Sequence, residues 1–227
     1  MSEAGEGRRI ASYGAWDSAI APGDAVGAAR SVADIELDNG VVWLTELRPD
    51  AAGQAQIVRL RPDGVAEDVL PAQLSARTRA HEYGGGALLA DKGIVYFTND
   101  SDQRIWRDAP GAKPQPLTPE GPWRYADMVA DPARGRLIAV REDHSGEGEA
   151  KNALVAIDLA SGAVRELWGH SDFVAAPRLS PDGGRLAWIA WDHPNMPWDA
   201  TTLHIATLDA GGAIARTYDV CPASEGF

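Results

Sequence analysis

The chain has 227 residues, a net charge of −12 from 33 acidic against 21 basic side chains, and one cysteine. Such an acidic chain offers no basic patch to neutralise phosphates, so nucleic acid is excluded as an expected partner. A lone cysteine, Cys221, excludes an internal disulfide and favours a reducing compartment. No apolar run reaches the length of a membrane span or resembles a signal peptide, so we expect a cytoplasmic protein without membrane contact.

Short apolar segments divided by turn residues fill most of the sequence. The 24 glycines and 15 prolines occur at short intervals, and no sustained amphipathic helix pattern interrupts them. This pattern predicts an all-β chain of many short strands.

A four-strand unit recurs along the chain. Four apolar segments align with one another, each after a turn rich in Asp and Gly: 41–45, 94–98, 137–141 and 186–190. Each is followed by a polar loop and a third strand (55–60, 103–107, 153–159 and 202–208), then by a fourth strand ending near residues 69, 117, 168 and 218. Units of four strands at intervals of about 40–50 residues are typical of propeller blades.

We therefore predict a partial β-propeller of about four blades, at 32–75, 76–120, 121–169 and 170–220. A partly disordered segment, 1–31, precedes the blades, and a tail, 221–227, follows them without beginning a fifth. A β-sandwich would not explain the repeated order of turns, and the strands lie too close together for crossover helices.

Several segments carry a resemblance to a known family. They are Tyr13-Gly-x-Trp-x-Ser-x-Ile20, Arg77-Thr-Arg-x-His-Glu-Tyr-Gly-Gly-Gly86, Tyr125-Ala-Asp-Met128, Asp131-Pro-x-Arg-Gly-Arg-Leu137, Arg141-Glu-Asp-His144, Ala176-Pro-Arg-Leu-Ser-Pro-Asp-Gly183 and Trp191-Asp-His-Pro-Asn-Met-Pro-Trp-Asp199. At these positions the chain resembles the prolyl oligopeptidase family of serine peptidases. The branch that it resembles most includes acylaminoacyl-peptidases, dipeptidyl-aminopeptidase-like enzymes and puromycin hydrolase-type aminopeptidases.

The resemblance implies that substrate access and catalysis belong to two different domains. In that family an N-terminal propeller caps a C-terminal α/β-hydrolase domain that holds a Ser-Asp-His triad, and this sequence matches only the propeller. It contains no Gly-x-Ser-x-Gly nucleophile elbow. We therefore expect the catalytic domain to be absent from this chain, the chain alone to be inactive, and no cofactor to be needed. The implied partners are the hydrolase domain and short peptides or aminoacyl amides, which the propeller would admit by size.

Two loops hold the candidate substrate-binding residues. His81, Glu82 and Tyr83 lead into three glycines, where a carboxylate at the propeller mouth would hold a substrate's amino group; the alternative is that the glycines only let the backbone pass closely. The second set lies in a loop stiffened by prolines, where its side chains would either line a substrate passage or cover the blade edge and cap a turn. Its members are His193, Asn195, Trp198 and Asp199.

Other functions stay open as alternatives. The first is a stand-alone propeller that binds proteins or peptides, and a WD-type pattern occurs in only one blade. A monomer of four blades would favour this alternative, whereas an open half-propeller would self-associate through its unpaired strand edges. A metal-dependent propeller hydrolase is weaker: Asp143, His144, Asp192 and His193 occupy matching positions after their strands, but the repeat itself explains the match. No metal site is expected.

Overall fold

The computed structural model describes residues 12–15, 21, 23 and 29–221. Most of the predicted N-terminal segment and the tail after residue 221 lie outside these residues. The Tyr13–Ile20 motif is described only as far as residue 15, where a short turn forms.

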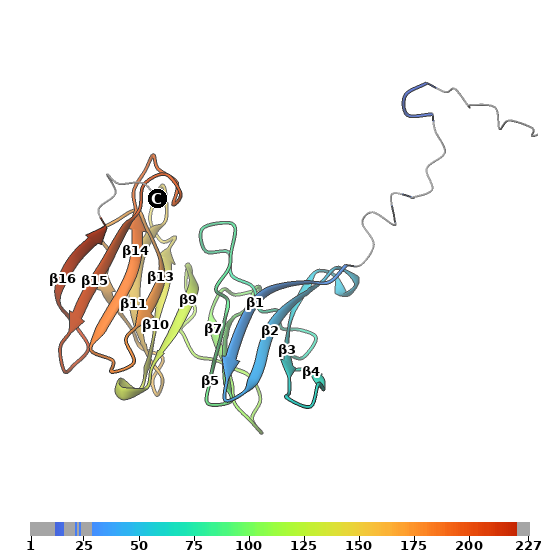
Figure 1. Ribbon diagram of the computed structural model, residues 1–227, viewed down its shortest axis with the longest axis horizontal. Coiled ribbons are helices and arrows are strands. Elements are labelled where there is room, and N and C mark those ends of the chain that lie inside the picture. Colours follow the sequence, from blue (N-terminus) through green and yellow to red (C-terminus); the bar gives the residue numbers. More distant parts are fainter. Residues whose placement is uncertain (1–11, 16–20, 22, 24–28, 222–227) are drawn as a thin grey trace, which may run out of the picture.

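Four antiparallel sheets of four strands each make up the described chain, and each sheet keeps its strands in sequence order. Blade 1 contains β1 (Ser31–Asp38), β2 (Val41–Arg48), β3 (Gln54–Leu60) and β4 (Ala66–Asp68); blade 2 contains β5 (Leu88–Asp91), β6 (Ile94–Thr98), β7 (Ile105–Asp108) and β8 (Gln115–Pro116). Blade 3 contains β9 (Trp123–Asp131), β10 (Arg136–Asp143), β11 (Lys151–Asp158) and β12 (Val164–Trp168); blade 4 contains β13 (Phe173–Leu179), β14 (Arg185–Trp191), β15 (Thr202–Leu208) and β16 (Ile214–Cys221). The predicted all-β partial propeller is confirmed (Figure 1).

Turn chemistry fixes the register inside each blade. Between β13 and β14, the Ser180 hydroxyl donates to Asp182 at 2.6 Å, and Gly183 donates its N–H to the Ser180 carbonyl at 2.8 Å. Gly183 has a φ of +69°, a conformation that glycine adopts without steric cost. After this turn, Leu186, Trp188 and Ala190 alternate onto one buried face of the sheet.

Hydrophobic side chains fill the space between successive blades. One buried cluster combines Trp43 and Ile57 of blade 1 with Val95 and Phe97 of blade 2. A second cluster joins blades 2 and 3, and a third joins blades 3 and 4 around Trp188. Each sheet buries a face only against a neighbouring sheet, so the stability of each blade depends on the blades beside it.

The first strands of the blades, β1, β5, β9 and β13, lie side by side along the inner side of the arc. Polar contacts join them at irregularities in the pairing. Asp34 accepts the Gly86 N–H at 3.0 Å, and Asp127 accepts the Ala176 N–H at 2.8 Å. Asp127 also donates its own N–H to the Gly86 carbonyl at 2.8 Å. Carboxylates of blades 1 and 3 thus bind the backbone of blades 2 and 4.

Apolar side chains are exposed to solvent at both ends of the arc. Ile35 and Leu37 of β1 are 68% and 71% exposed, and Tyr218 and Val220 of β16 are also exposed. In blade 2, the matching residues Leu88 and Ala90 of β5 are only 3% and 8% exposed, because they face blade 1. An unpaired first and last blade is what a partial propeller leaves.

Each blade has two edges with different connections. The turns between first and second strands and between third and fourth strands lie along one edge, here called the turn rim; examples are residues 39–40 and 61–65. The connections between second and third strands, and those between blades, lie along the other edge, the loop rim; examples are residues 144–150 and 192–201. Within the described part of the chain, no helix is long and apolar enough to cross a membrane.

Candidate functional site

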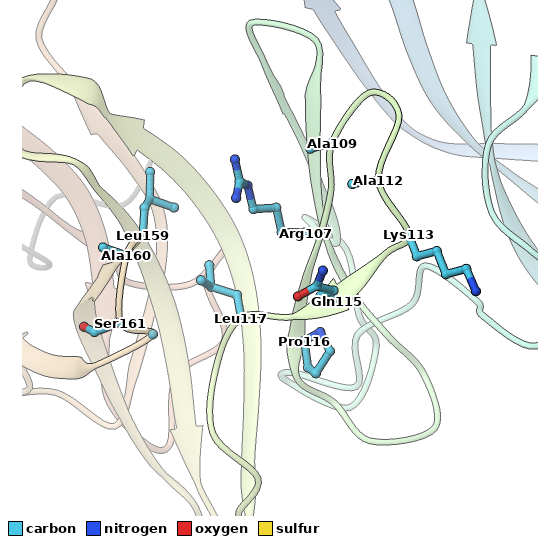
Figure 2. A pocket seen from close by; sticks show the side chains of 11 residues that line it. Arg107, Ala109, Ala112, Lys113, Gln115, Pro116, Leu117, Leu159, Ala160 and Ser161 are labelled. Carbon is cyan, nitrogen blue, oxygen red and sulfur yellow. The ribbon is translucent and has the colours of Figure 1, made fainter.

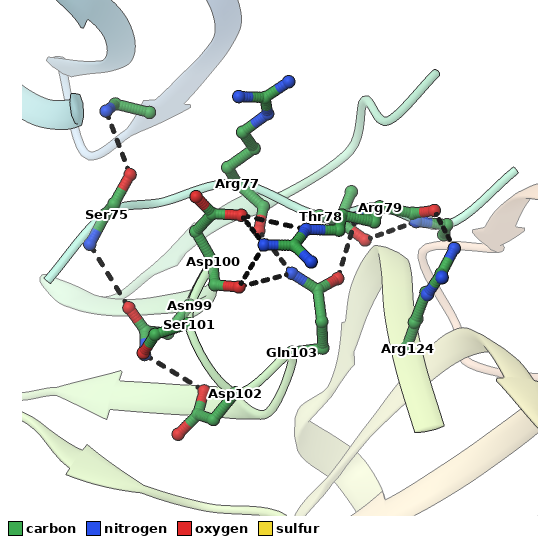
Figure 3. A network of polar contacts seen from close by, with 12 residues as sticks. Ser75, Arg77, Thr78, Arg79, Asn99, Asp100, Ser101, Asp102, Gln103 and Arg124 are labelled. Atoms are coloured by element: carbon green, nitrogen blue, oxygen red, sulfur yellow. Dashed lines mark hydrogen bonds and ion pairs between the residues drawn. The ribbon is translucent and has the colours of Figure 1, made fainter. Parts of the chain in front are cut away.

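A strap of irregular backbone, residues 71–87, runs over the loop rim of blades 1 and 2 and carries the His81-Glu82-Tyr83 motif. A polar network ties it down (Figure 3). At its start, the Ser75 hydroxyl accepts the Ala55 N–H at 3.0 Å, and the Asn99 side chain accepts the Ser75 N–H at 3.2 Å. The strap is thereby joined to blade 1 and to the β6–β7 loop of blade 2.

Gln103 continues this network. Its side-chain oxygen accepts the Arg79 N–H at 2.7 Å, and its amide donates to the Asp100 carbonyl at 3.0 Å. The sequence predicted residue 103 as the start of a strand; that prediction is wrong, because Gln103 has a φ of 56° and β7 begins two residues later. The residue supports the strap instead of pairing in the sheet.

His81 and Glu82 sit in left-handed backbone conformations, with φ of 55° and 63°. Residues other than glycine adopt these values rarely, and they persist where surrounding contacts hold them. The His81 N–H donates to the Glu142 carboxylate at 2.5 Å, across from blade 3. The following glycines permit close approach: a Cβ on Gly86 would lie 2.1 Å from the Asp127 carboxylate.

Glu82 points a carboxylate into solvent at this rim, with its side chain 79% exposed. Arg124 at the start of β9 donates to its Oε1 at 2.5 Å and to the Arg79 carbonyl at 2.9 Å. The hydrogen bond from Arg124 lowers the pKa of the Glu82 carboxyl, so it is ionised at neutral pH. No described residue donates to the second oxygen of Glu82.

Below this pair lies a buried carboxylate. Glu142 is 4% exposed; its Oε2 contacts the His144 ring at 3.1 Å and lies 3.8 Å from Arg124. Arg124 therefore lies between one buried and one exposed carboxylate, which fixes the guanidinium at the rim.

Aromatic rings form a wall beside these charges. The His81 ring lies 5.6 Å from Tyr83, 5.9 Å from Phe173 and 5.7 Å from Trp191, between centroids. Phe173 stacks on Trp191 at 5.2 Å, and the His193 ring meets Phe173 edge-on at 4.9 Å. The structure thus brings the two sequence-predicted histidines to one rim, with Phe173 between them.

The other predicted residues lie in the β14–β15 loop. Asp199 accepts the Met196 N–H at 3.0 Å and Asn195 donates to the Asp192 carbonyl at 3.3 Å, so both shape the β14–β15 loop. Trp198 is 71% exposed and has no ring contact within the described chain, so both readings of this side chain, a passage wall and a cover for the blade edge, stay predictions. His193 pairs with the exposed carboxylate of Glu149.

Sequence reasoning missed Arg124, Phe173 and Trp191 as rim residues. Phe173 and Trp191 face each other across β13 and β14 and read as ordinary core aromatics. Glu142 and His144 lie within one motif of the family resemblance, Arg141–His144, and Trp191 begins another, Trp191–Asp199; these motifs were the signals that the sequence offered. Their role depends on the strap, sixty residues earlier in the chain.

The matching post-strand acids do not gather around one point. Asp143 accepts the Ser145 N–H of its own loop at 2.9 Å, whereas Asp192 accepts the N–H of Asp172, in the connection between β12 and β13, at 2.8 Å. Among the described residues, no three His, Cys, Asp or Glu side chains form a group that could hold a metal ion.

The turn rim has cavities of its own, between blades. One of about 250 Å³ lies between blades 2 and 3, where Arg107 and Leu117 face Leu159 and Ser161 (Figure 2). It is separate from the His81 site, because it opens among the turns at the opposite edge of the blades. It contains no element of the strap.

Comparison with solved structures gives a clear relationship. The chain is 36% identical to a puromycin-hydrolyzing peptidase of Mycobacterium tuberculosis, with a TM-score of 0.84 over 94% of this chain and 36% of that one. It is 38% identical to a puromycin hydrolase, with a TM-score of 0.83 over 94% of this chain and 36% of that one. The chain therefore spans about a third of the length of these relatives.

More distant structures share the fold alone. An acylaminoacyl peptidase of Pyrococcus horikoshii is 12% identical, with a TM-score of 0.56 over 85% of this chain and 32% of that one. No protein-family model matches the chain, and neither does a curated protein.

The identity, the near-complete coverage of this chain and the shared blade architecture agree with the motifs quoted from the sequence. The chain belongs to the prolyl oligopeptidase family of peptidases and matches its N-terminal propeller region.

Proposed function

We propose that this chain is the substrate-gating and substrate-binding part of a serine peptidase whose Ser-Asp-His triad lies in an α/β-hydrolase domain outside this chain. Its loop rim faces that domain and receives the free amino end of short peptides or aminoacyl amides. The observation that carries the proposal is the exposed, ionised carboxylate of Glu82, held by Arg124 beside a wall of aromatic rings. This arrangement suits an ammonium group attached to an apolar side chain.

Each part of the rim has a role in this proposal. The unoccupied oxygen of Glu82 accepts from the substrate ammonium, a charge-assisted hydrogen bond. The rings of Tyr83 and His193 flank the substrate's first side chain. The strap network and the left-handed backbone at His81 hold these groups in place before substrate arrives, which limits the ordering cost of binding.

Exposed apolar side chains at the same rim support contact with a further protein surface. Tyr83, Met196 and Trp198 are all exposed, and aromatic and methionine side chains are enriched at interfaces. In the proposal that surface belongs to the hydrolase domain. A stand-alone binding propeller, the second candidate, would use the same side chains on a separate protein.

Phenylalanine amide and its N-acetyl derivative test the proposal, because only the first has an ammonium group. We expect calorimetry to show phenylalanine amide binding at least about tenfold more tightly than the acetylated amide. Glu82→Gln should abolish that difference, and Glu166→Gln, a change to an exposed side chain on the outer strand β12, should preserve it. Equal binding of both amides to the wild-type chain would contradict the role of Glu82.

A further inference from the structure

The cavity between blades 2 and 3 on the turn rim presents an arginine that has no acidic partner. Its volume is about 250 Å³, and none of its lining residues is acidic. Arg107 of β7 extends toward Leu117 and Leu159, two leucines that pack on the hydrophobic cluster between these blades (Figure 2). No described acid forms an ion pair with Arg107. The cavity lies at the opposite edge of the blades from Glu82, so the inference is independent of the proposed function.

The register of blade 2 places the Arg107 side chain. Tyr96, Arg107 and Gln115 lie side by side across β6, β7 and β8 and therefore share one face of the sheet. Tyr96 belongs to the buried cluster between blades 2 and 3, so this face is the one toward blade 3. Burial raises the pKa of the Tyr96 hydroxyl, and the neighbouring Arg107 guanidinium opposes that shift. The sheet thus directs the guanidinium into the space between the two blades.

Blade 1 contains the same row of side chains with one difference. Trp43, Arg59 and Glu67 lie side by side across β2, β3 and β4, and Trp43 belongs to the cluster between blades 1 and 2. Glu67 forms an ion pair with Arg59, and the hydrogen bond from Arg59 lowers the pKa of the Glu67 carboxyl. An arginine at this position of a blade therefore has a carboxylate as its partner.

Blade 2 keeps this arginine but lacks the carboxylate, because Gln115 occupies the position that Glu67 has in blade 1. The facing turn of blade 3 does not replace it: Asp158 already accepts the N–H groups of Ala160 and Ser161. We propose that this cavity binds a carboxylate ligand, which pairs with Arg107 as Glu67 pairs with Arg59. The NH2 group of Gln115 is a second donor for the same ligand.

The size and walls of the cavity limit the ligand. About 250 Å³ lies below the usual range for drug-sized molecules and suits a carboxylate on a short apolar chain, whose methylene groups contact Leu117 and Leu159. Lys113, the other cation at the cavity, points away from Arg107 (Figure 2). One guanidinium fork matches the two oxygens of a carboxylate. A phosphate has more charge and more acceptor oxygens than Arg107 and Gln115 would satisfy between two leucines.

Nuclear magnetic resonance of the backbone amides of residues 107, 115 and 162 tests the site. In low salt, we expect propionate to shift these signals saturably and propionamide, its neutral analogue, to leave them unchanged. Arg107→Gln should weaken the propionate response at least about fivefold, because it removes a charge-assisted hydrogen bond. Arg77→Gln, which removes an exposed arginine from the strap at the loop rim, should not change the response.

Gln115→Glu gives blade 2 the residue that blade 1 has. The introduced carboxyl should pair with Arg107, titrate below its usual pKa of about 4.3 and prevent propionate from binding. Gln115→Ala removes only the amide and should retain most of the response. Equal responses to propionate and propionamide, or propionate binding to the Gln115→Glu variant as to wild type, would overturn the proposal. A response to inorganic phosphate as strong as that to propionate would also overturn it.

Two carboxylates distinguish the possible sources of the ligand. N-acetylglutamate methylamide carries a side-chain carboxylate between two peptide groups, and propionate is a free acid. Tighter binding of the first assigns the site to an acidic side chain of a partner protein, and tighter binding of propionate assigns it to a small free acid. In both cases the proposal requires that Arg107→Gln weaken binding; an unchanged affinity in that variant would contradict it.

Discussion

Two carboxylates near the inner strands, Asp34 and Asp127, each bind the backbone of the next blade. Burial raises the pKa of Asp34, against the opposing effect of its hydrogen bond from Gly86. Its contribution to stability is fully present below the unfolded-state pKa, near 3.8, and is lost as the pH rises through the folded-state pKa. At neutral pH the buried charge of Asp34 therefore opposes folding, while its geometry aligns the blades.

Asp34→Asn tests this sign. Asparagine keeps a carbonyl oxygen for the Gly86 N–H but cannot ionise, so the variant should be more stable than wild type at pH 7 and similar to it near pH 3. Urea unfolding at both pH values measures the difference. A loss of stability at pH 7 that exceeds any loss at pH 3 would contradict the assignment.

Asp158 provides a matched control of opposite sign. Hydrogen bonds from Ser161 lower the pKa of this exposed carboxyl, so its contribution to stability is present above the unfolded-state pKa and is lost as the pH falls through the folded-state pKa. Asp158→Asn should therefore reduce stability at pH 7 and have no effect well below pH 3.

Between elements, a buried ion-pair cluster of Asp131, Arg134 and Arg136, here called the clasp, joins blade 3 to blade 4. Asp131, at the end of β9, is 0% exposed and accepts from Arg136 Nε at 2.8 Å and from Arg134 at 3.1 Å. The two arginines also reach blade 4: Arg136 donates to the Gly212 carbonyl at 2.9 Å and Arg134 to the Gly183 carbonyl at 3.0 Å. The clasp gives a structural reason for the Asp-Pro-x-Arg-Gly-Arg motif.

Arg136→Ala should destabilise the chain by about 3–5 kcal/mol, because it leaves the Asp131 charge buried with one partner fewer. Arg30→Ala is a suitable control, since Arg30 pairs with Glu46 and Asp50 at the surface and should contribute at most about 1 kcal/mol. Denaturant unfolding compares the two variants. Similar losses in both would show that the clasp does not couple the blades.

Elements differ in how far the sequence predicts them. The second strand of each blade followed from apolar residues after an Asp- and Gly-rich turn, and β14 contains the whole of the predicted segment 186–190. The strap at 71–87 was not predicted as a unit, because contacts with Asn99, Gln103 and Glu142 decide its path. The local pattern of apolar and polar residues predicts the strands within a blade. It does not predict the contacts between blades.

Some residues of the candidate site were predicted from the sequence, but their arrangement was not. The sequence named His81, Glu82 and His193 from their loops and the family resemblance. It did not place them together, since their juxtaposition depends on the packing of β9 and β13 within the arc. Phe173 joins the two histidines only after that packing is formed.

At the scale of the whole molecule, we predict that this chain self-associates through the exposed face of blade 1. Ile35 and Leu37 present apolar surface of the kind that is buried between the other blades. Light scattering across a concentration series should show reversible association of this chain, and Leu37→Lys should shift it toward monomer. A monodisperse wild-type monomer at high concentration would refute this prediction and favour the stand-alone binding propeller.

The whole chain, in our proposal, binds and admits substrate while the chemistry belongs to a domain outside it. Hydrolysis of aminoacyl and peptidyl amides by the repurified 227-residue chain, followed with a fluorophosphonate serine probe, tests this division most directly. We predict no turnover and no covalent labelling, because the sequence contains no nucleophile elbow. Turnover that survives repurification and is blocked by the fluorophosphonate would contradict the proposal.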